Sequence, residues 1–148
     1  MDKRKISTIV FLNRKRLILT SRNKMIFGTG IDIVDIKKIK KTVEKWGKSF
    51  NDKIFTPQEL NYCYQKKSPF QHLAARFAAK EAFLKALGRA ERSGIRWKEI
   101  QINSKDGGQP FYRLKGSVNS WVNREKIKPF LTISHTGNYA IAHCLLEK

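Results

Sequence analysis

The stretch Arg76-Phe-Ala-Ala-Lys-Glu-Ala-Phe-Leu-Lys-Ala-Leu-Gly88 decides the fold, because it forms most of a long helical pattern. The pattern begins near Phe70 and stops at Gly88, a residue type that commonly ends helices. Steps of four and three residues return to one helical face, which here carries Leu73, Phe77, Glu81 and Leu84. An ionised acid on an apolar stripe is expensive to bury without a partner. Glu81 is therefore either one half of an ordinary surface pair with Lys85 or a functional group, such as a metal ligand or general base.

A second carboxylate interrupts an apolar strand upstream. Residues 25–34 predict a β-strand in which Ile31 and Ile33 face one side and Asp32 faces the other. The preceding glycines of Gly28-Thr-Gly30 allow another backbone to approach the strand closely. Alone, Asp32 is compatible with an exposed position. Two carboxylates on neighbouring elements suit Mg²⁺, which typically takes one or two carboxylates together with substrate phosphates and waters.

Two further helices are predicted between these segments. The first carries apolar residues at helical spacing: Ile36, Ile39, Val43, Trp46 and Phe50. Lysines fill the positions between them: Lys37, Lys38, Lys40, Lys41, Lys45 and Lys48. The second helix starts at a capping box formed by Thr56, with Pro57 at the first helical position and Glu59 at the third, and it ends at Ser68-Pro69.

The C-terminal half of the chain reads as short strands and one helix. Residues 97–103 and 110–114 predict two strands joined by a turn at Asp106-Gly107-Gly108. A short helix is expected at 116–126, followed by a hairpin of strands at 130–135 and 139–146. Together these elements predict an α+β fold, in which a mostly antiparallel sheet packs against the long helix and a basic helix precedes it.

Composition narrows the class of protein. The chain has 148 residues and a formal net charge of +19, and its apolar runs are too short for a membrane-spanning helix. Two distant cysteines form no disulfide scaffold or cysteine zinc site, which fits a reducing compartment, and we expect a cytoplasmic protein. The charge favours an anionic partner: nucleic acid, an anionic membrane, a polyphosphate or an acidic protein.

The charge is not confined to one end. Residues 1–24 carry a net +7 and residues 25–148 a net +12. We interpret 1–24 as a basic leader, disordered or not native, and an organelle-transit segment is the alternative. Residues 25–148 are expected to form a single domain.

Four motifs in this order resemble the 4′-phosphopantetheinyl transferase superfamily, and more narrowly its small bacterial-type holo-[acyl-carrier-protein] synthase branch. They are Gly30-Ile-Asp-Ile-Val34, Phe55-Thr-x-x-Glu59, Arg76 to Gly88, and Ile133-Ser-His-Thr136 followed by Ala140-Ile-Ala. The resemblance covers residues 25–148 and implies the fold of that family. It also implies transfer of the 4′-phosphopantetheine group of coenzyme A to a serine of apo acyl carrier protein, in support of fatty acid biosynthesis. Adenosine 3′,5′-bisphosphate is the other product.

The resemblance implies a role for each matching residue. Asp32 and Glu81 match the Mg²⁺ ligands, and Lys85 matches the lysine beside the reacting phosphate. Three further residues are expected to contact coenzyme A: Arg76, Lys80 and His135. The general base is left open between Glu81 and a water that it orients. Family members of this size are usually homotrimers with active sites between subunits.

The basic helix matches the one that docks the acidic carrier protein in the family. Its docking residues are expected to be Lys37, Lys38, Lys40, Lys41 and Lys45. The alternative interpretation is that these lysines form an ordinary solvent-exposed face with no partner. The alternative function is a basic nucleic-acid-binding module without catalytic activity. It is disfavoured because the aromatic residues lie on the apolar stripes and do not alternate with the lysines as a stacking platform requires.

Overall fold

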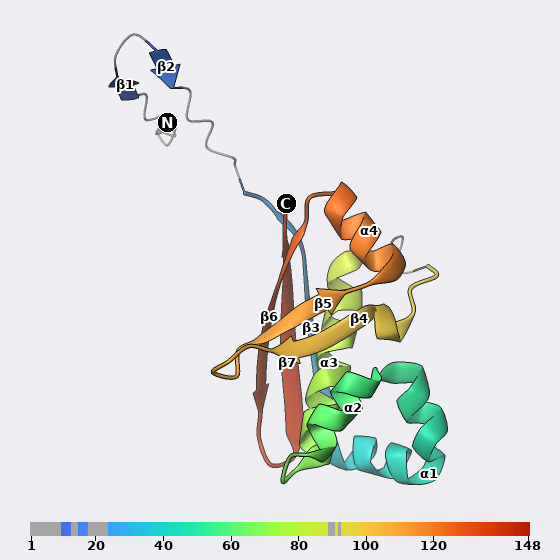
Figure 1. Cartoon of the computed structure of the whole chain (residues 1–148). Helices are drawn as coiled ribbons and strands as arrows, with labels where there is room; N and C mark the ends of the chain where they lie inside the picture. The colour runs from blue at the N-terminus through green and yellow to red at the C-terminus, as the bar shows by residue number, and fades with distance from the viewer. Residues whose placement is uncertain (1–9, 13–14, 18–23, 89–90, 92) are drawn as a thin grey trace, which may run out of the picture.

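The computed structural model describes residues 10–12, 15–17, 24–88, 91 and 93–148. Strands and helices form separate layers, which confirms the α+β prediction (Figure 1). The helices are α1 (Ile36–Ile54), α2 (Pro57–Tyr64), α3 (Pro69–Leu87), the 3₁₀ helix η2 (Trp97–Glu99) and α4 (Gly116–Arg124). The strands are β1 (Val10–Leu12), β2 (Lys15–Leu17), β3 (Ile26–Asp35), β4 (Ile100–Ser104), β5 (Pro110–Leu114), β6 (Lys128–His135) and β7 (Tyr139–Glu147).

The main sheet is antiparallel and has the order β3-β7-β6. Both predicted hairpins are confirmed, since β4 pairs with β5 and β6 pairs with β7. The predicted leader, residues 1–24, lies mostly outside the described residues; its described parts are Lys24 and the strands β1 and β2, which pair with each other. In the described part of the chain, no helix is both long and apolar enough to span a membrane.

Helix α3 lies directly on β3 because two glycines of the strand leave room for it. A Cβ atom added at Gly28 would collide with the backbone carbonyl of Ala86, and one added at Gly30 would collide with that of Ala82. The facing surface of α3 is built from small alanines, so the two backbones approach closely. Because of this contact, side chains of β3 and α3 that flank the glycines lie close to one another.

Gly30→Ala is expected to lower the free energy of unfolding by about 1–3 kcal/mol, because the added methyl forces α3 away from β3. Urea unfolding of the full chain measures this effect. The matched control is Gly137→Ala, at a turn where an added Cβ meets no atom within 4 Å. Equal stability of the two variants would contradict the close approach.

Helix α1 presents its lysines to solvent and its apolar stripe to the core, as predicted. The Asp35 carboxylate caps its N-terminus by accepting from the backbone N–H groups of Lys37 and Lys38. Trp46 continues the apolar stripe in the sequence, yet its side chain is 59% exposed. Gly47 has a φ of 46° and kinks the helix directly after Trp46, so the chain turns before the stripe can bury this ring.

Several predicted boundaries need correction, and the helix expected to end at Ser68-Pro69 ends at Tyr64. The strand expected at 97–103 begins only at Ile100, because residues 97–99 form the turn of η2. The helix expected at 116–126 ends at Arg124. Cys63 and Cys144 are buried free thiols. Burial raises the pKa of Cys63 to about 11 and that of Cys144 to about 12, so both stay protonated at neutral pH.

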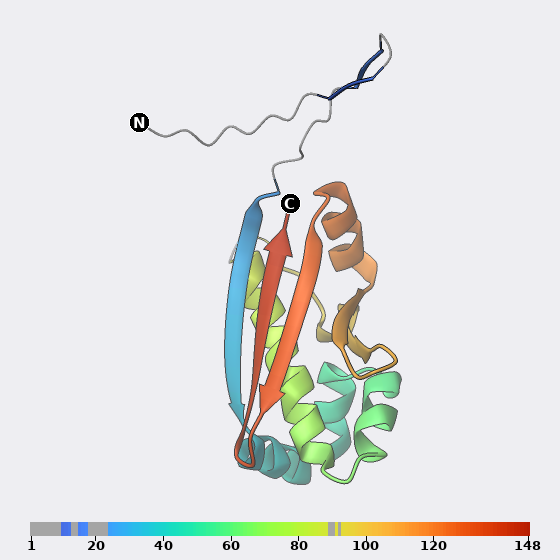
Figure 2. The same cartoon turned by 90° about the vertical axis from the view of Figure 1, so that its left-hand side faces the viewer.

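The outer face of the main sheet is apolar and open. Ile31 and Ile33 are 56% and 63% exposed, and Phe130 and Tyr139 of the neighbouring strands are also exposed. The strand alternation predicted for β3 is confirmed, with its isoleucines on the outer side. In Figure 2 none of the described helices lies in front of the three strands, so within the described residues no helix covers this face.

Candidate active site

A cavity of about 560 Å³ opens between β3, α1 and α3. Asp32 from β3 and Glu81 from α3 both line it, so the structure brings together the two carboxylates that the sequence singled out. Lys38 of α1 lines the same cavity. Its apolar wall includes Val34, Ile39, Phe50, Phe77 and Tyr139. A second cavity of about 360 Å³ beside α4 contains none of the predicted site residues.

Lys85 lies next to these carboxylates. Its Nζ atom is 2.7 Å from Oδ1 of Asp32 and also donates to the backbone carbonyl of Ile31 at 2.9 Å. Glu81 and Lys85 stand one turn apart on α3, and the glycine contact of β3 holds Asp32 against that turn. The Lys85 ammonium therefore lies against Asp32, one of the two acids that line the cavity.

The donor set fits a hard divalent cation that a substrate completes. The two carboxylates come from a strand and a helix. In the described ranges, no group of three or more His, Cys, Asp and Glu side chains is placed to enclose a metal ion. Mg²⁺ usually keeps waters and is bound by one or two carboxylates plus substrate phosphates. Asp32 and Glu81 would supply that protein share.

Arg76 belongs to the N-terminal half of α3, and His135 at the end of β6 lies beside that half. Neither residue lines the carboxylate cavity. Arg76 is buried, and its guanidinium carbon stands 4.1 Å from the centre of the Tyr62 ring. Its Nε atom is buried with no hydrogen-bond partner among the described residues. The amide nitrogen of Gln71 lies 3.1 Å from Nε2 of the exposed His135. Partial burial and the Arg76 charge lower the pKa of the nearby His72, which keeps that ring neutral.

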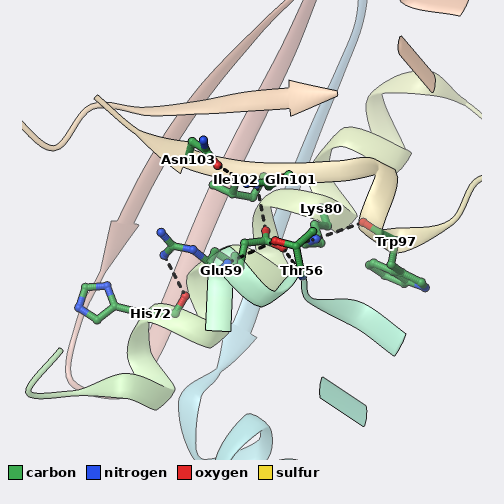
Figure 3. A network of polar contacts seen from close by, with 9 residues as sticks. Thr56, Glu59, His72, Lys80, Trp97, Gln101, Ile102 and Asn103 are labelled. Atoms are coloured by element: carbon green, nitrogen blue, oxygen red, sulfur yellow. Dashed lines mark hydrogen bonds and ion pairs between the residues drawn. The ribbon is translucent and has the colours of Figure 1, made fainter. Parts of the chain in front are cut away.

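Lys80 points into the protein core. Its side chain is fully buried, and Nζ lies 2.9 Å from Oε2 of Glu59 (Figure 3). The structure therefore does not bring Lys80 to the carboxylate cavity. The sequence identified Glu59 as a capping residue and as the end of the Phe55-Thr-x-x-Glu59 motif, and the capping box is confirmed. No local pattern marked its contact with Lys80, which lies 21 positions away.

The predicted docking face of α1 is exposed and strongly basic. All five predicted lysines lie on the surface: Lys37, Lys38, Lys40, Lys41 and Lys45. Lys40 is 3.8 Å from Glu44, and Lys45 lies over the exposed Trp46 ring at 4.9 Å. Because Lys38 also lines the cavity, the basic face begins at the cavity rim.

Comparison with known proteins identifies the family. The family model of the 4′-phosphopantetheinyl transferase superfamily matches residues 28–144. The holo-[acyl-carrier-protein] synthase of Geotalea daltonii is 46% identical over 125 residues, which covers 84% of this chain and 100% of that protein. The chain belongs to the holo-[acyl-carrier-protein] synthases. The resemblance read from the sequence motifs is thereby confirmed.

Solved structures of this synthase family share the fold. The synthase of Neisseria meningitidis is 35% identical and superposes with a TM-score of 0.77, covering 84% of this chain and 100% of its own. The ACPS–CoA complex of Chronobacterium ammoniagenes is 32% identical with a TM-score of 0.71, covering 80% and 95% respectively. The segment that matches the superfamily contains every residue of the carboxylate cavity.

Proposed function

We propose that this chain transfers the 4′-phosphopantetheine group of coenzyme A to a serine of apo acyl carrier protein. One observation carries the proposal: Asp32 and Glu81 share a cavity whose rim runs into the basic face of α1. This arrangement joins a cation-binding site for a pyrophosphate to a docking face for an acidic protein. Membership of the synthase family and the coenzyme A complex of a relative support the same assignment.

In this reaction the serine oxygen forms a bond to the β-phosphorus of coenzyme A. The bond from that phosphorus to the bridging oxygen breaks, and adenosine 3′,5′-bisphosphate leaves with the bond electrons. Phosphoryl transfer depends mainly on positioning and charge neutralisation. Asp32 and Glu81 would hold Mg²⁺, which when bound neutralises charge on the phosphate oxygens.

Further side chains in and around the cavity are proposed to assist the transfer. Lys85, held 2.7 Å from Asp32, places an ammonium beside the pyrophosphate. The serine proton passes to Glu81 or to a water that it orients. The apolar wall at Phe50 and Phe77 limits water access on the α1 side. Arg76 and His135 are proposed to contact coenzyme A outside this cavity.

The carrier protein is proposed to dock on α1. Exposed lysines along one helix attract an acidic partner, set its orientation and make the encounter sensitive to salt. The docking set is Lys37, Lys38, Lys40, Lys41 and Lys45. A carrier bound there delivers its serine to the cavity rim at Lys38. We place this activity in the cytoplasm, in fatty acid biosynthesis.

The active form is proposed to be a homotrimer, with sites between subunits. Its support is the open outer face of the main sheet, where Ile31 and Ile33 flank Asp32 along β3 and are more than half exposed. A large exposed apolar patch is typical of an interaction surface. A subunit packed on this face would lie close to the site. Sedimentation equilibrium of the full chain measures the assembly's mass against the 17.2 kDa of one chain.

Analysis of the small-molecule products tests the proposed function. With coenzyme A, Mg²⁺ and an apo acyl carrier protein, one adenosine 3′,5′-bisphosphate should form for each coenzyme A consumed. Omission of the carrier or addition of EDTA should stop its formation. Unconsumed coenzyme A, together with tight binding of RNA at physiological salt, would instead favour the nucleic-acid-binding alternative.

A further inference from the structure

A buried ion pair precedes Glu81 and has no part in the chemistry proposed above. The side chains of Lys80 and Glu59 are both fully buried, with 2.9 Å between Nζ and Oε2. Taking two charges out of water is costly, and well-packed apolar residues in their place often give equal or greater stability. Stability alone therefore does not account for this pair.

Glu59 is the centre of a network that joins four elements (Figure 3). Its Oε2 atom accepts from the backbone N–H of Thr56 at 2.8 Å and from Lys80, and Oε1 accepts from the backbone N–H of Ile102 at 2.9 Å. Lys80 donates a second bond to the carbonyl oxygen of Trp97 at 3.1 Å. The pair thus ties α3 to the N-terminus of α2, to β4 and to η2.

The position of Lys80 on α3 connects this network to the site. Successive residues of an α-helix are rotated by about 100°, with a rise of about 1.5 Å. Lys80 therefore enters the core while Glu81 enters the cavity. Two acceptors fix the Lys80 ammonium, and this restrains rotation of α3 about its axis at the next residue. Any such rotation would shift Glu81 relative to Asp32, which stands on a different element.

We infer that Lys80 and Glu59 are positioning residues, which hold Glu81 in register with Asp32 and so set the affinity of the carboxylate pair for a divalent cation. The inference rests on the proposed function. It gives Lys80 a role through Glu81 and not through direct contact with coenzyme A. Binding sites need their ligands held to within about 0.5 Å, which a doubly bonded buried ammonium can provide.

The test compares cation affinity with stability in a charge-neutral double variant, Glu59→Gln/Lys80→Met. The introduced glutamine side chain keeps a carbonyl acceptor, and the loss of one acid and one base leaves the net charge unchanged. Mn²⁺ is the probe, and its binding to the full chain with coenzyme A is followed by electron paramagnetic resonance. We expect affinity to fall about tenfold or more and kcat to fall similarly, with the carrier KM unchanged. The urea unfolding midpoint should fall only modestly, because glutamine can accept from only one of the two backbone N–H groups that Glu59 binds.

The matched control is Arg124→Met/Glu125→Gln, which removes the ion pairs of Glu125 with Arg124 and Lys148 at the end of α4 and should leave Mn²⁺ affinity unchanged. If Glu59→Gln/Lys80→Met does not fold, the single variant Glu59→Asp is used, which keeps both buried charges but shortens the acid's reach, and it should also weaken Mn²⁺ binding. A folded variant with parental Mn²⁺ affinity and kcat would overturn the inference. A parent chain that binds Mn²⁺ but modifies no carrier would contradict the proposed function instead, and the Mn²⁺ comparison would still decide the positioning role.

Discussion

Glu81→Gln is expected to lower the transfer rate roughly 10²–10³-fold, because it removes one of two charges that hold a cation against the pyrophosphate. The substitution is nearly isosteric, and Glu81 is only half-buried, so the fold should persist. Asp32→Asn should have an effect of similar size and in addition frees Lys85 from its 2.7 Å ion pair. Single-turnover measurements with saturating coenzyme A and carrier give the rate of the chemical step.

Asp106→Asn is the matched control for these variants. It removes an exposed carboxylate from the turn between β4 and β5, away from the cavity, and should leave the rate unchanged. If both Glu81→Gln and Asp32→Asn kept the parental rate while Asp106→Asn did likewise, the carboxylate cavity would not be the catalytic site.

Lys41→Glu/Lys45→Glu is expected to raise the KM for the carrier at least about tenfold at low salt, since it places two acids on the face that meets an acidic partner. Neither lysine lines the cavity, so kcat and the KM for coenzyme A should change little. The difference from the parent should shrink as salt rises, because the Debye length falls from about 10 Å at 0.1 M to about 3 Å at 1 M.

The control for this variant is Lys105→Glu/Lys126→Glu, which makes the same change in net charge at two exposed positions outside α1. It separates docking on α1 from a general effect of charge. Equal rises in carrier KM for the two double variants would contradict docking on this helix.

Local signals predicted most of the elements correctly. The capping box at Thr56 and Glu59 and the glycine stop at Gly88 each act over a few residues, so their sequence patterns suffice. The sequence also singled out Asp32 and Glu81, because each acid interrupts an apolar pattern of its own element. Their placement on one cavity depends on the glycines of β3, which allow α3 to approach the strand.

Other features depend on contacts between distant segments and could not be read locally. Lysine is a residue type that usually lies on the surface, and only the folded chain brings Glu59 to Lys80. Trp46 continues the apolar stripe of α1, yet the kink at Gly47 leaves it exposed. An alternating strand such as β3 shows two faces, but the pattern does not say that the face with Ile31 is open in the single chain.

The intact mass of the carrier protein tests the central claim most directly. After incubation with the full chain, coenzyme A and Mg²⁺, the apo carrier should gain the mass of one phosphopantetheine group. A carrier whose acceptor serine is replaced by alanine should gain nothing, and EDTA should prevent the gain. An unchanged mass with several apo carriers, from a folded chain that binds both Mn²⁺ and coenzyme A, would contradict the assignment.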